Sequence, residues 1–275
     1  MKFINFYIGN TTLDFQIDDL VTYIKFKHSN LAVITNQMIL KFPNATIFDA
    51  AHSKLREINS FSFNKVAKLT HIFLHHNKLS TIRDHVFVHS SGLKVLDLSY
   101  NEISVLQKDA FGSLTFLQEL NLASNKIKSL KDQIFKSLAS LKWLFLNDNL
   151  IMRISSKVFS NANQALEGIF LNSNKINALS KNAFDELENL RFLILAGNEC
   201  INMDFKNHVI FDNIQIAFEL KTCHENHRKM FSHEHERNLT SMVEEMNAVY
   251  ATCQGRIMLL NDTIIKYNEA IKSFE

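Results

Sequence analysis

The sequence predicts an α/β fold: a solenoid of about eight 24-residue repeats with a concave parallel sheet, followed by a C-terminal helical or coiled-coil tail. Three observations predict it. A motif of leucines and an asparagine recurs every 24 residues, a phenylalanine recurs at the same interval, and the apolar spacing changes after residue 223. We therefore expect an N-terminal cap at 1–20, a repeat solenoid at 21–199, a C-terminal cap at 200–223 and a helical heptad tail at 224–275.

The composition is that of a folded chain with a sizeable core. The 275 residues are 46% apolar, and the net charge of +2 points to no nucleic acid or anionic membrane. No apolar run approaches the roughly 18 residues of a membrane span. The apolar stretch at 3–8 is too short and too polar for a secretory signal, so a signal has been removed or was never present.

The repeat is the most specific signal in the chain. Its template is L-x-x-L-x-L-x-x-N-x-L, whose positions we number one to eleven. Six consecutive copies begin at Leu69, Leu93, Leu117, Leu141, Leu166 and Leu190, and two weaker copies begin at Val21 and Ala45. This template is typical of the leucine-rich repeat family, in which each L-x-L core is a short strand and the stacked strands form one parallel sheet.

Two further features support the stack. The asparagine at position nine can donate and accept, so we expect it to pair backbone groups where the chain leaves the strand; Ser29 and Ser53, in the weaker copies, can do this only in part. A phenylalanine lies ten residues after position nine in six repeats, which predicts a buried spine behind the sheet. These residues are Phe63, Phe87, Phe111, Phe135, Phe159 and Phe184.

Positions two, three, five, seven and eight should face away from the core, and in the C-terminal half they are aromatic or apolar. We predict a ligand-binding surface on the concave face at Trp143, Phe145, Phe170, Phe192 and Ile194. Contiguous exposed aromatic residues usually mark a contact surface. The alternative is that the chain's own C-terminal segment covers them.

The N-terminal repeats instead carry histidines: His28, His52, His71, His75 and His76. Zinc usually needs a fourth ligand and supporting hydrogen bonds, and no cysteine or carboxylate is clearly placed to complete such a site. We therefore interpret them as a solvated polar surface and predict no metal; a metal site or a pH switch is the alternative.

The tail changes to a heptad period. Position a holds Val243, Tyr250, Ile257, Ile264 and Ile271, and position d holds Leu239, Met246, Cys253, Leu260, Tyr267 and Phe274. This pattern favours a parallel helix pair, and hence a second helical chain in a homo- or heterodimer. Flanking positions lack complementary charges and Gly255 costs about 1 kcal/mol relative to alanine in a helix, so packing within the chain is the alternative.

The cysteines and glycosylation motifs bear on whether the protein is extracellular or intracellular. Cys200 ends the last repeat and Cys223 begins the tail, which suits a disulfide that closes the C-terminal cap. Cys253 on the heptad seam is either a small hydrophobic residue or an interchain bond. Four asparagines, Asn10, Asn44, Asn238 and Asn261, stand in Asn-x-Thr and are candidate glycosylation sites, a number that chance alone would supply.

Catalytic motifs are missing from the sequence. It contains no phosphate-binding glycine loop, no G-x-S-x-G and no H-E-x-x-H. His224, His227, His233 and His235 lie among glutamates in a pattern typical of a solvated helix face. We expect no cofactor and no enzyme.

The arrangement resembles secreted insect leucine-rich repeat proteins, in particular the leucine-rich immune molecules of the mosquito complement-like system. The stretches "ILKFPNATIFDAAHSKLREI" and "LAGNECINMDF", followed by Cys223 and the heptads, carry the resemblance. It implies a secreted protein that is joined through disulfides, with Cys253 as the joining cysteine, and that carries an opsonin in innate immunity.

We therefore predict a non-enzymatic, secreted recognition protein whose concave face binds a protein ligand and whose tail dimerises. One alternative is an adhesion or receptor ectodomain. A second is an intracellular leucine-rich repeat scaffold or inhibitor with reduced thiols.

Overall fold

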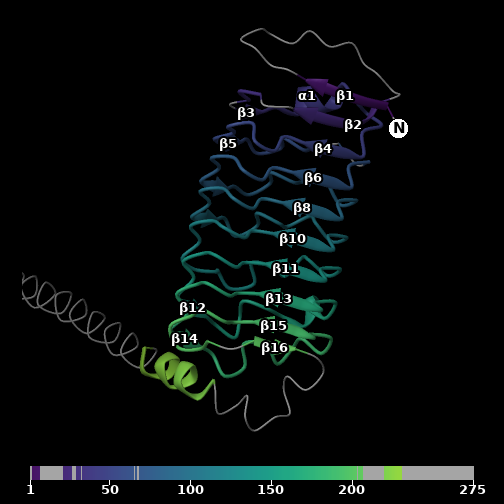
Figure 1. The fold of residues 1–275 in the computed structure, drawn as a ribbon. Coiled ribbons are helices and arrows are strands. Elements are labelled where there is room, and N and C mark those ends of the chain that lie inside the picture. The colour runs from purple at the N-terminus through teal and green to yellow at the C-terminus, as the bar shows by residue number, and fades with distance from the viewer. Residues whose placement is uncertain are drawn as a thin grey trace, which may run out of the picture. The chain divides into compact units, whose positions relative to one another are not determined.

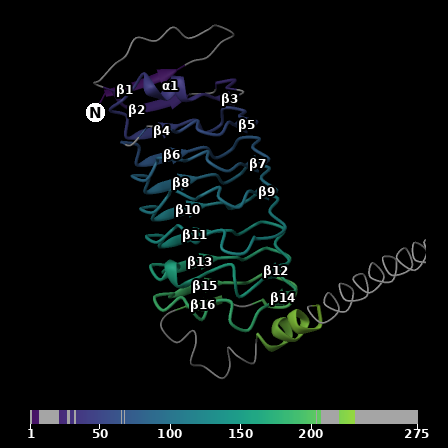
Figure 2. The same ribbon diagram turned by 180° about the vertical axis from the view of Figure 1, so that it is seen from behind.

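A computed structural model describes residues 2–6, 21–26, 29–31, 33–64, 66, 68–202, 204–206 and 220–230. Strands stack in chain order along one side of the repeat array (Figure 1), and the return segments run along the other side (Figure 2). The predicted solenoid with a parallel sheet is therefore confirmed.

The main sheet has ten strands, eight of which lie at the L-x-L core of the eight predicted repeats. They pair in parallel and in register, so that each residue lies beside the residue 24 positions later, or 25 positions later between β11 and β13. The eight are β2 (Val21–Phe26), β4 (Ile47–Asp49), β6 (His71–Phe73), β8 (Val95–Asp97), β10 (Glu119–Asn121), β11 (Trp143–Phe145), β13 (Gly168–Phe170) and β15 (Phe192–Ile194).

The other two strands lie at the ends of the sheet. β1 (Lys2–Phe6) pairs in parallel with β2, inside the segment that we expected to be the N-terminal cap. β16 (Asp204–Lys206) pairs antiparallel with β15. Residues 7–20, the rest of the expected N-terminal cap, lie outside the described part of the chain.

Side chains complete the last turn. In the preceding turn, the amides of Leu171 and Ser173 donate to the carbonyls of Ile194 and Ala196, one turn further along. The last turn has no such successor. The Asp204 carboxylate accepts from the amides of Leu195 and Ala196 at 3.1 and 3.0 Å, and Asn202 accepts from Gly197 at 2.7 Å. These bonds satisfy amides that would otherwise be left open at the end of the array.

The return segments contain little regular structure. Short parallel pairs join β3 (Val33–Ile34) to β5 (Glu57–Ile58), β7 (Thr81–Ile82) to β9 (Val105–Leu106), and β12 (Arg153–Ile154) to β14 (Ala178–Leu179). The helical pieces are α1 (Asn36–Leu40) and the 3-10 helix η1 (Asn161–Asn163). η1 takes up the extra residue of the 25-residue interval, and buried Asn163 donates to the Phe135 carbonyl at 2.8 Å.

The core consists of the template leucines and isoleucines and the predicted phenylalanine spine. All six spine rings are at most 4% exposed, and neighbours pack with ring centroids 5.6 Å apart for Phe63 and Phe87 and 5.8 Å apart for Phe135 and Phe159. Burying one such side chain contributes about 1.5–3 kcal/mol, whereas ordering one residue costs about 1–2 kcal/mol. A single turn cannot recover that cost alone, so the turns are stable only as a stack.

The asparagine ladder forms as predicted. Asn125 accepts from the Ile103 amide at 2.9 Å and donates to the carbonyls of Leu98 and Leu122 at 3.1 and 3.0 Å. Asn77, Asn101, Asn149, Asn174 and Asn198 make equivalent bonds. Ser53 provides only the donor half, to Phe26 and Ala51, so the Leu31 amide pairs with the backbone carbonyl of Ser53 instead.

The residue immediately before the ladder position has a left-handed backbone in seven repeats. Only Gly197, with φ of 71°, is a glycine; His52, His76, Tyr100, Ser124, Asp148 and Ser173 have φ between 52° and 55°. This conformation costs a non-glycine residue about 1–2 kcal/mol. The amide of each one donates to a carbonyl of the next turn, as Tyr100 does to Ala123 at 3.0 Å, which helps to offset the cost.

Residues 221–230 are helical, so the helix begins three residues before the expected start of the tail. The chain divides into two compact units, 1–227 and 228–275, and the structure describes only 228–230 of the second unit. The heptad seam at 239–274 and Cys253 lie outside the described residues. Among the described residues, no helix is long and apolar enough to cross a lipid bilayer.

Candidate functional site

Two columns of side chains form the outer surface of the main sheet, which we call the sheet face. Each of the eight repeat strands buries its central leucine, isoleucine or phenylalanine and turns template positions three and five to the other side, where all but Asp49 and Gly168 are partly exposed. Position three holds Tyr23, Ile47, His71, Val95, Glu119, Trp143, Gly168 and Phe192 in strand order. Position five holds Lys25, Asp49, Phe73, Asp97, Asn121, Phe145, Phe170 and Ile194.

The five predicted ligand-binding residues come together on β11, β13 and β15, and we call them the aromatic patch: Trp143, Phe145, Phe170, Phe192 and Ile194. The rings of Phe145 and Phe170 stack with centroids 4.6 Å apart. Trp143 lies 5.9 Å from Phe192 and 6.3 Å from Phe170. All five side chains are half-buried, so the patch keeps part of its apolar surface open.

Gly168 explains how Trp143 reaches Phe192 across the strand between them. A Cβ atom added to Gly168 would lie 2.5 Å from two ring carbons of Trp143. The indole therefore occupies the space that a side chain at position three of β13 would take. The sequence interpretation missed this contact, although a glycine between two aromatic residues at the same template position was a usable signal.

The alternative of self-coverage concerns the C-terminal segments 207–219 and 231–275. These residues lie outside the described part of the chain. The assignment of the patch to a ligand therefore stays a prediction.

A polar network occupies the N-terminal end of the sheet face. The Asp49 carboxylate accepts from the Tyr23 hydroxyl at 2.9 Å and from the Lys25 ammonium at 2.6 Å, and its other oxygen accepts from the Ala51 amide at 3.1 Å. The hydrogen bond to Asp49 raises the pKa of Lys25, and burial, followed by the same carboxylate, raises the pKa of Tyr23. The sequence interpretation did not anticipate this network.

The predicted histidine surface is partly ordered by ring stacking. His52 stacks on His76 at 4.4 Å and His76 stacks on Tyr100 at 4.3 Å, so three residues with left-handed backbones form a column of rings. His75 Nδ1 lies 3.2 Å from an Asp97 carboxylate oxygen. His28 lies outside the described residues.

Burial also acts on two titratable groups at the centre of the sheet face. Burial, and then the positive charge of Lys94, lowers the pKa of His71. Burial, and then the negative charge of Asp97, raises the pKa of Glu119. Across the described ranges, no group of three or more histidine, cysteine or acidic side chains is arranged to hold a metal ion.

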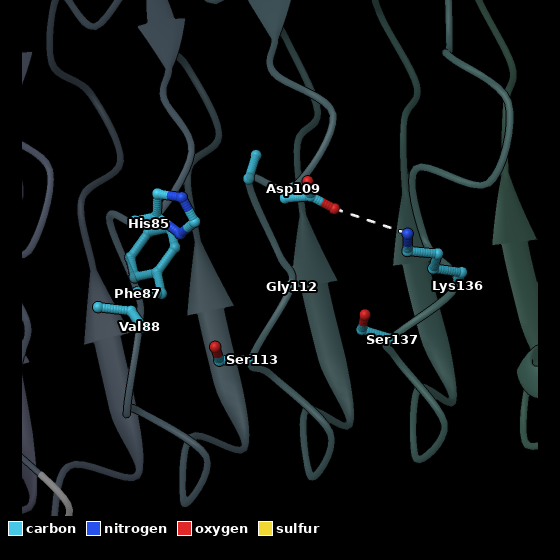
Figure 3. A pocket seen from close by; sticks show the side chains of 9 residues that line it. His85, Phe87, Val88, Asp109, Gly112, Ser113, Lys136 and Ser137 are labelled. Carbon is cyan, nitrogen blue, oxygen red and sulfur yellow. Dashed lines mark ion pairs between the residues drawn. The ribbon is translucent and has the colours of Figure 1, made fainter.

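A separate hollow lies among the return segments of three consecutive turns (Figure 3). His85 and Phe87 come from the first turn, Asp109 from the second and Lys136 from the third. Asp109 and Lys136 form an ion pair of 3.6 Å across the hollow. The hollow's charged groups therefore neutralise each other, and its lining suggests no particular chemistry.

The C-terminal cap contains the disulfide. Cys200 and Cys223 are bonded, with Cα atoms 5.2 Å apart, and this bond fixes the start of the helix to the last repeat. Asn226 adds a hydrogen bond of 2.9 Å to the Asn177 carbonyl. Of the four glycosylation candidates, only Asn44 is described; it is half-buried and accepts a hydrogen bond from Lys68. Asn10, Asn238 and Asn261 fall outside the described residues.

The sequence model described as "Leucine rich repeat" matches five overlapping segments: 43–103, 67–127, 91–151, 115–164 and 146–199. The chain belongs to the leucine-rich repeat family. The matches begin after the first of the eight predicted repeats and end at the C-terminal cap. No curated protein matches the sequence significantly.

Solved structures of this family share the fold. The TLR13–ssRNA13 complex aligns with a TM-score of 0.62 and 26% identity over 71% of this chain and 27% of TLR13. Drosophila Toll, solved with Spatzle, aligns with a TM-score of 0.54 and 21% identity over 64% of this chain and 26% of Toll. A Leptospira interrogans leucine-rich repeat protein aligns with a TM-score of 0.57 and 20% identity, over 64% of this chain and 43% of that protein. This chain thus spans only about a quarter of the length of the first two.

Proposed function

We propose that this leucine-rich repeat chain is a non-enzymatic recognition protein that binds a protein ligand through the aromatic patch. The observation that carries the proposal is the contact of Trp143 with Phe192 across Gly168, beside the stacked Phe145 and Phe170. Aromatic residues are enriched in the central region of protein interfaces, where each one can bury a large apolar area.

Ligand binding is consistent with the similar structures, because TLR13 was solved as a complex with ssRNA13. For this chain the surface chemistry favours protein over nucleic acid. Nucleic-acid affinity depends on clustered lysines and arginines, whereas the patch is apolar and the net charge of the chain is only +2.

An extracellular location is part of the proposal, and the disulfide supports it. Disulfides persist in oxidising compartments and are rare in the cytosol. The resemblance to insect immune proteins would place this chain in innate immunity, whereas the alternatives are an adhesion or receptor ectodomain and an intracellular scaffold or inhibitor. Mass spectrometry of native protein distinguishes them: three free thiols would support an intracellular scaffold, and a bonded Cys200 would count against it.

Dimerisation through the heptad tail is the second part of the proposal. The apolar seam from Leu239 to Phe274 supports it, as does the position of Cys253 on that seam. Non-reducing electrophoresis should show a dimer that Cys253→Ser abolishes. A wild-type protein that stays monomeric at every concentration would contradict this part alone.

The binding proposal is tested by capture from native fluid with identification of the bound protein. The double variant Trp143→Ala with Phe170→Ala should keep the fold and lose most of the capture, because both side chains are partly exposed. Phe116→Ala is the matched control, since Phe116 is an aromatic residue that is 61% exposed and lies outside the patch. Equal capture by the double variant and the control would refute the proposal.

A further inference from the structure

Glu119 borders the aromatic patch directly. On the sheet face it lies between Val95 of β8 and Trp143 of β11, its register partners on the two neighbouring strands. Adjacent strands are about 4.8 Å apart, and the Trp143 ring extends from β11 over Gly168, on the side away from Glu119. A long cationic side chain that lies across β11 can therefore pair with the Glu119 carboxylate and pack on the near side of the indole. The Glu119 side chain is half-buried.

Among the described residues, no counter-charge is paired with Glu119. Asp97, its acidic neighbour, accepts from the Ser99 amide and hydroxyl at 2.9 and 2.7 Å and lies 3.2 Å from His75. Lys142, which precedes Trp143, pairs with Glu167 at 3.1 Å. In the described part of the chain, the Glu119 carboxylate makes no hydrogen bond and no ion pair.

An unpaired, half-buried carboxylate is unfavourable for the folded state. Burial and the charge of Asp97 both raise the pKa of Glu119, which means that the fold disfavours the charged form. Charged groups that gain nothing from the fold are candidates for binding. A cation that arrived with a ligand would relieve this cost.

We propose that Glu119 and Trp143 form a subsite for an arginine or lysine side chain of the protein ligand, beside apolar residues that pack on Phe145, Phe170 and Phe192. The carboxylate supplies an ion pair and the indole face supplies a cation–π contact. A metal cation does not fit, because one carboxylate does not make a metal site and no ligand cluster surrounds it in the described residues. This inference deepens the proposed function and depends on it.

The experiment uses Trp143, the single tryptophan of the chain, as a fluorescent reporter. The probes are the peptide acetyl-Leu-Arg-Phe-Arg-Leu-amide and its analogue with citrulline, a neutral arginine isostere, in both arginine positions. The full-length wild type should bind the arginine peptide about tenfold more tightly than the citrulline peptide, because only the former pairs with Glu119. Glu119→Gln should remove that difference, and the control Glu188→Gln, at an exposed site away from the sheet face, should keep it.

The outcomes separate the two proposals. Equal binding of both peptides by the wild type would overturn the cation subsite and leave the aromatic patch as a binding surface. Failure of both peptides to bind would overturn the subsite, and capture from native fluid would then decide the patch independently.

Thermal unfolding of Glu119→Gln gives a second readout. The midpoint should stay the same or rise by about 1–2 °C, because an unpaired charge is removed. A fall of more than about 2 °C would show that Glu119 stabilises the fold, which would also overturn the proposal.

Discussion

The two halves of the sheet face have the same backbone and opposite chemistry. Near the N-terminus, polar groups pair with one another: Tyr23 and Lys25 both bond to Asp49. Toward the C-terminus, the four aromatic rings of the patch pack on one another and remain partly exposed. The repeat therefore determines where outward side chains stand, whereas the residues at positions three and five determine what the surface can bind.

The two halves also differ in whether their surface groups contribute to folding or remain free to contribute to binding. Partly exposed ion pairs contribute at most about 1 kcal/mol, so the N-terminal network stabilises the fold slightly and leaves little for a ligand. The aromatic patch leaves apolar area exposed among the described residues, and a partner that covered it would gain about 25 cal/mol per Å². The patch is thus the better candidate for binding.

The largest expected effect tests whether the two halves share one core. Phe63→Ala and Phe135→Ala, one in each half, remove rings that are fully buried. Each should lower the free energy of unfolding by about 3–5 kcal/mol, because each deletes apolar contacts and leaves a cavity. Urea denaturation of both variants measures this. A large effect in one half and almost none in the other would mean that the halves differ in their cores as well as on their surfaces.

The next effect sharpens the description of the C-terminal half. Gly168→Ala places a Cβ atom where the Trp143 ring lies, so the indole must move away from Phe192. We expect protein ligand binding to weaken about tenfold, equivalent to about 1.4 kcal/mol, and the Trp143 fluorescence to change. Gly112→Ala, away from the sheet face, is the control. Unchanged binding by Gly168→Ala would show that the continuity of the patch is unimportant.

In the N-terminal half, Asp49→Asn should lower the free energy of unfolding by at most about 1 kcal/mol at pH 8. The folded-state pKa values of Lys25 and Tyr23 are raised above their ordinary values of 10.5 and 10.0. The stability that these two groups gain from Asp49 is therefore present below pH 10 and is lost as the pH rises through their folded-state pKa values. Chemical denaturation from pH 8 to 11 should show the variant and wild type converging.

Asp185→Asn, at an exposed site, is the control for this experiment. A difference between the Asp49 variant and wild type that stays constant up to pH 11 would contradict the assignment to Lys25 and Tyr23.

The smallest effect concerns His71, in the N-terminal half. Its pKa is lowered by burial and by Lys94, so NMR titration should give a value below 6.5. The fold favours the neutral form of His71. The stability that this form contributes is fully present above pH 6.5 and is lost as the pH falls through the lowered pKa. Lys94→Met should raise the His71 pKa slightly, because a positive charge is removed, whereas Lys108→Met should not. A His71 pKa above 6.5 would mean that burial does not control this group.

The repeated parts of the structure could be predicted from the sequence because the same physical demand recurs in every turn. The apolar residue at position four is buried in all eight repeats, and asparagine at position nine links two turns in six of them, as Asn125 does. Regular spacing reveals such residues even in one sequence. The placement of Trp143 and Phe192 on the same face also followed from the template.

The parts that occur only once were missed, although Gly168 between Trp143 and Phe192 at the same template position was a usable signal for one of them. The contact of Trp143 with Gly168 depends on the volume of neighbouring side chains, and the isolation of Glu119 depends on Lys142 pairing with Glu167 instead. The left-handed backbone before the ladder was also missed, because residues such as His76 and Tyr100 rarely adopt it and therefore do not signal it as glycine would.

The closing bonds from Asp204 and Asn202 have a consequence for how such a protein changes in length. They satisfy amides of the final turn, whereas the cap reaches the preceding turn through the bond from Asn226 to the Asn177 carbonyl. Duplication or deletion of a 24-residue unit before Leu166 would therefore leave these closing bonds in place, so the outward surface could lengthen or shorten without a change at this end of the stack.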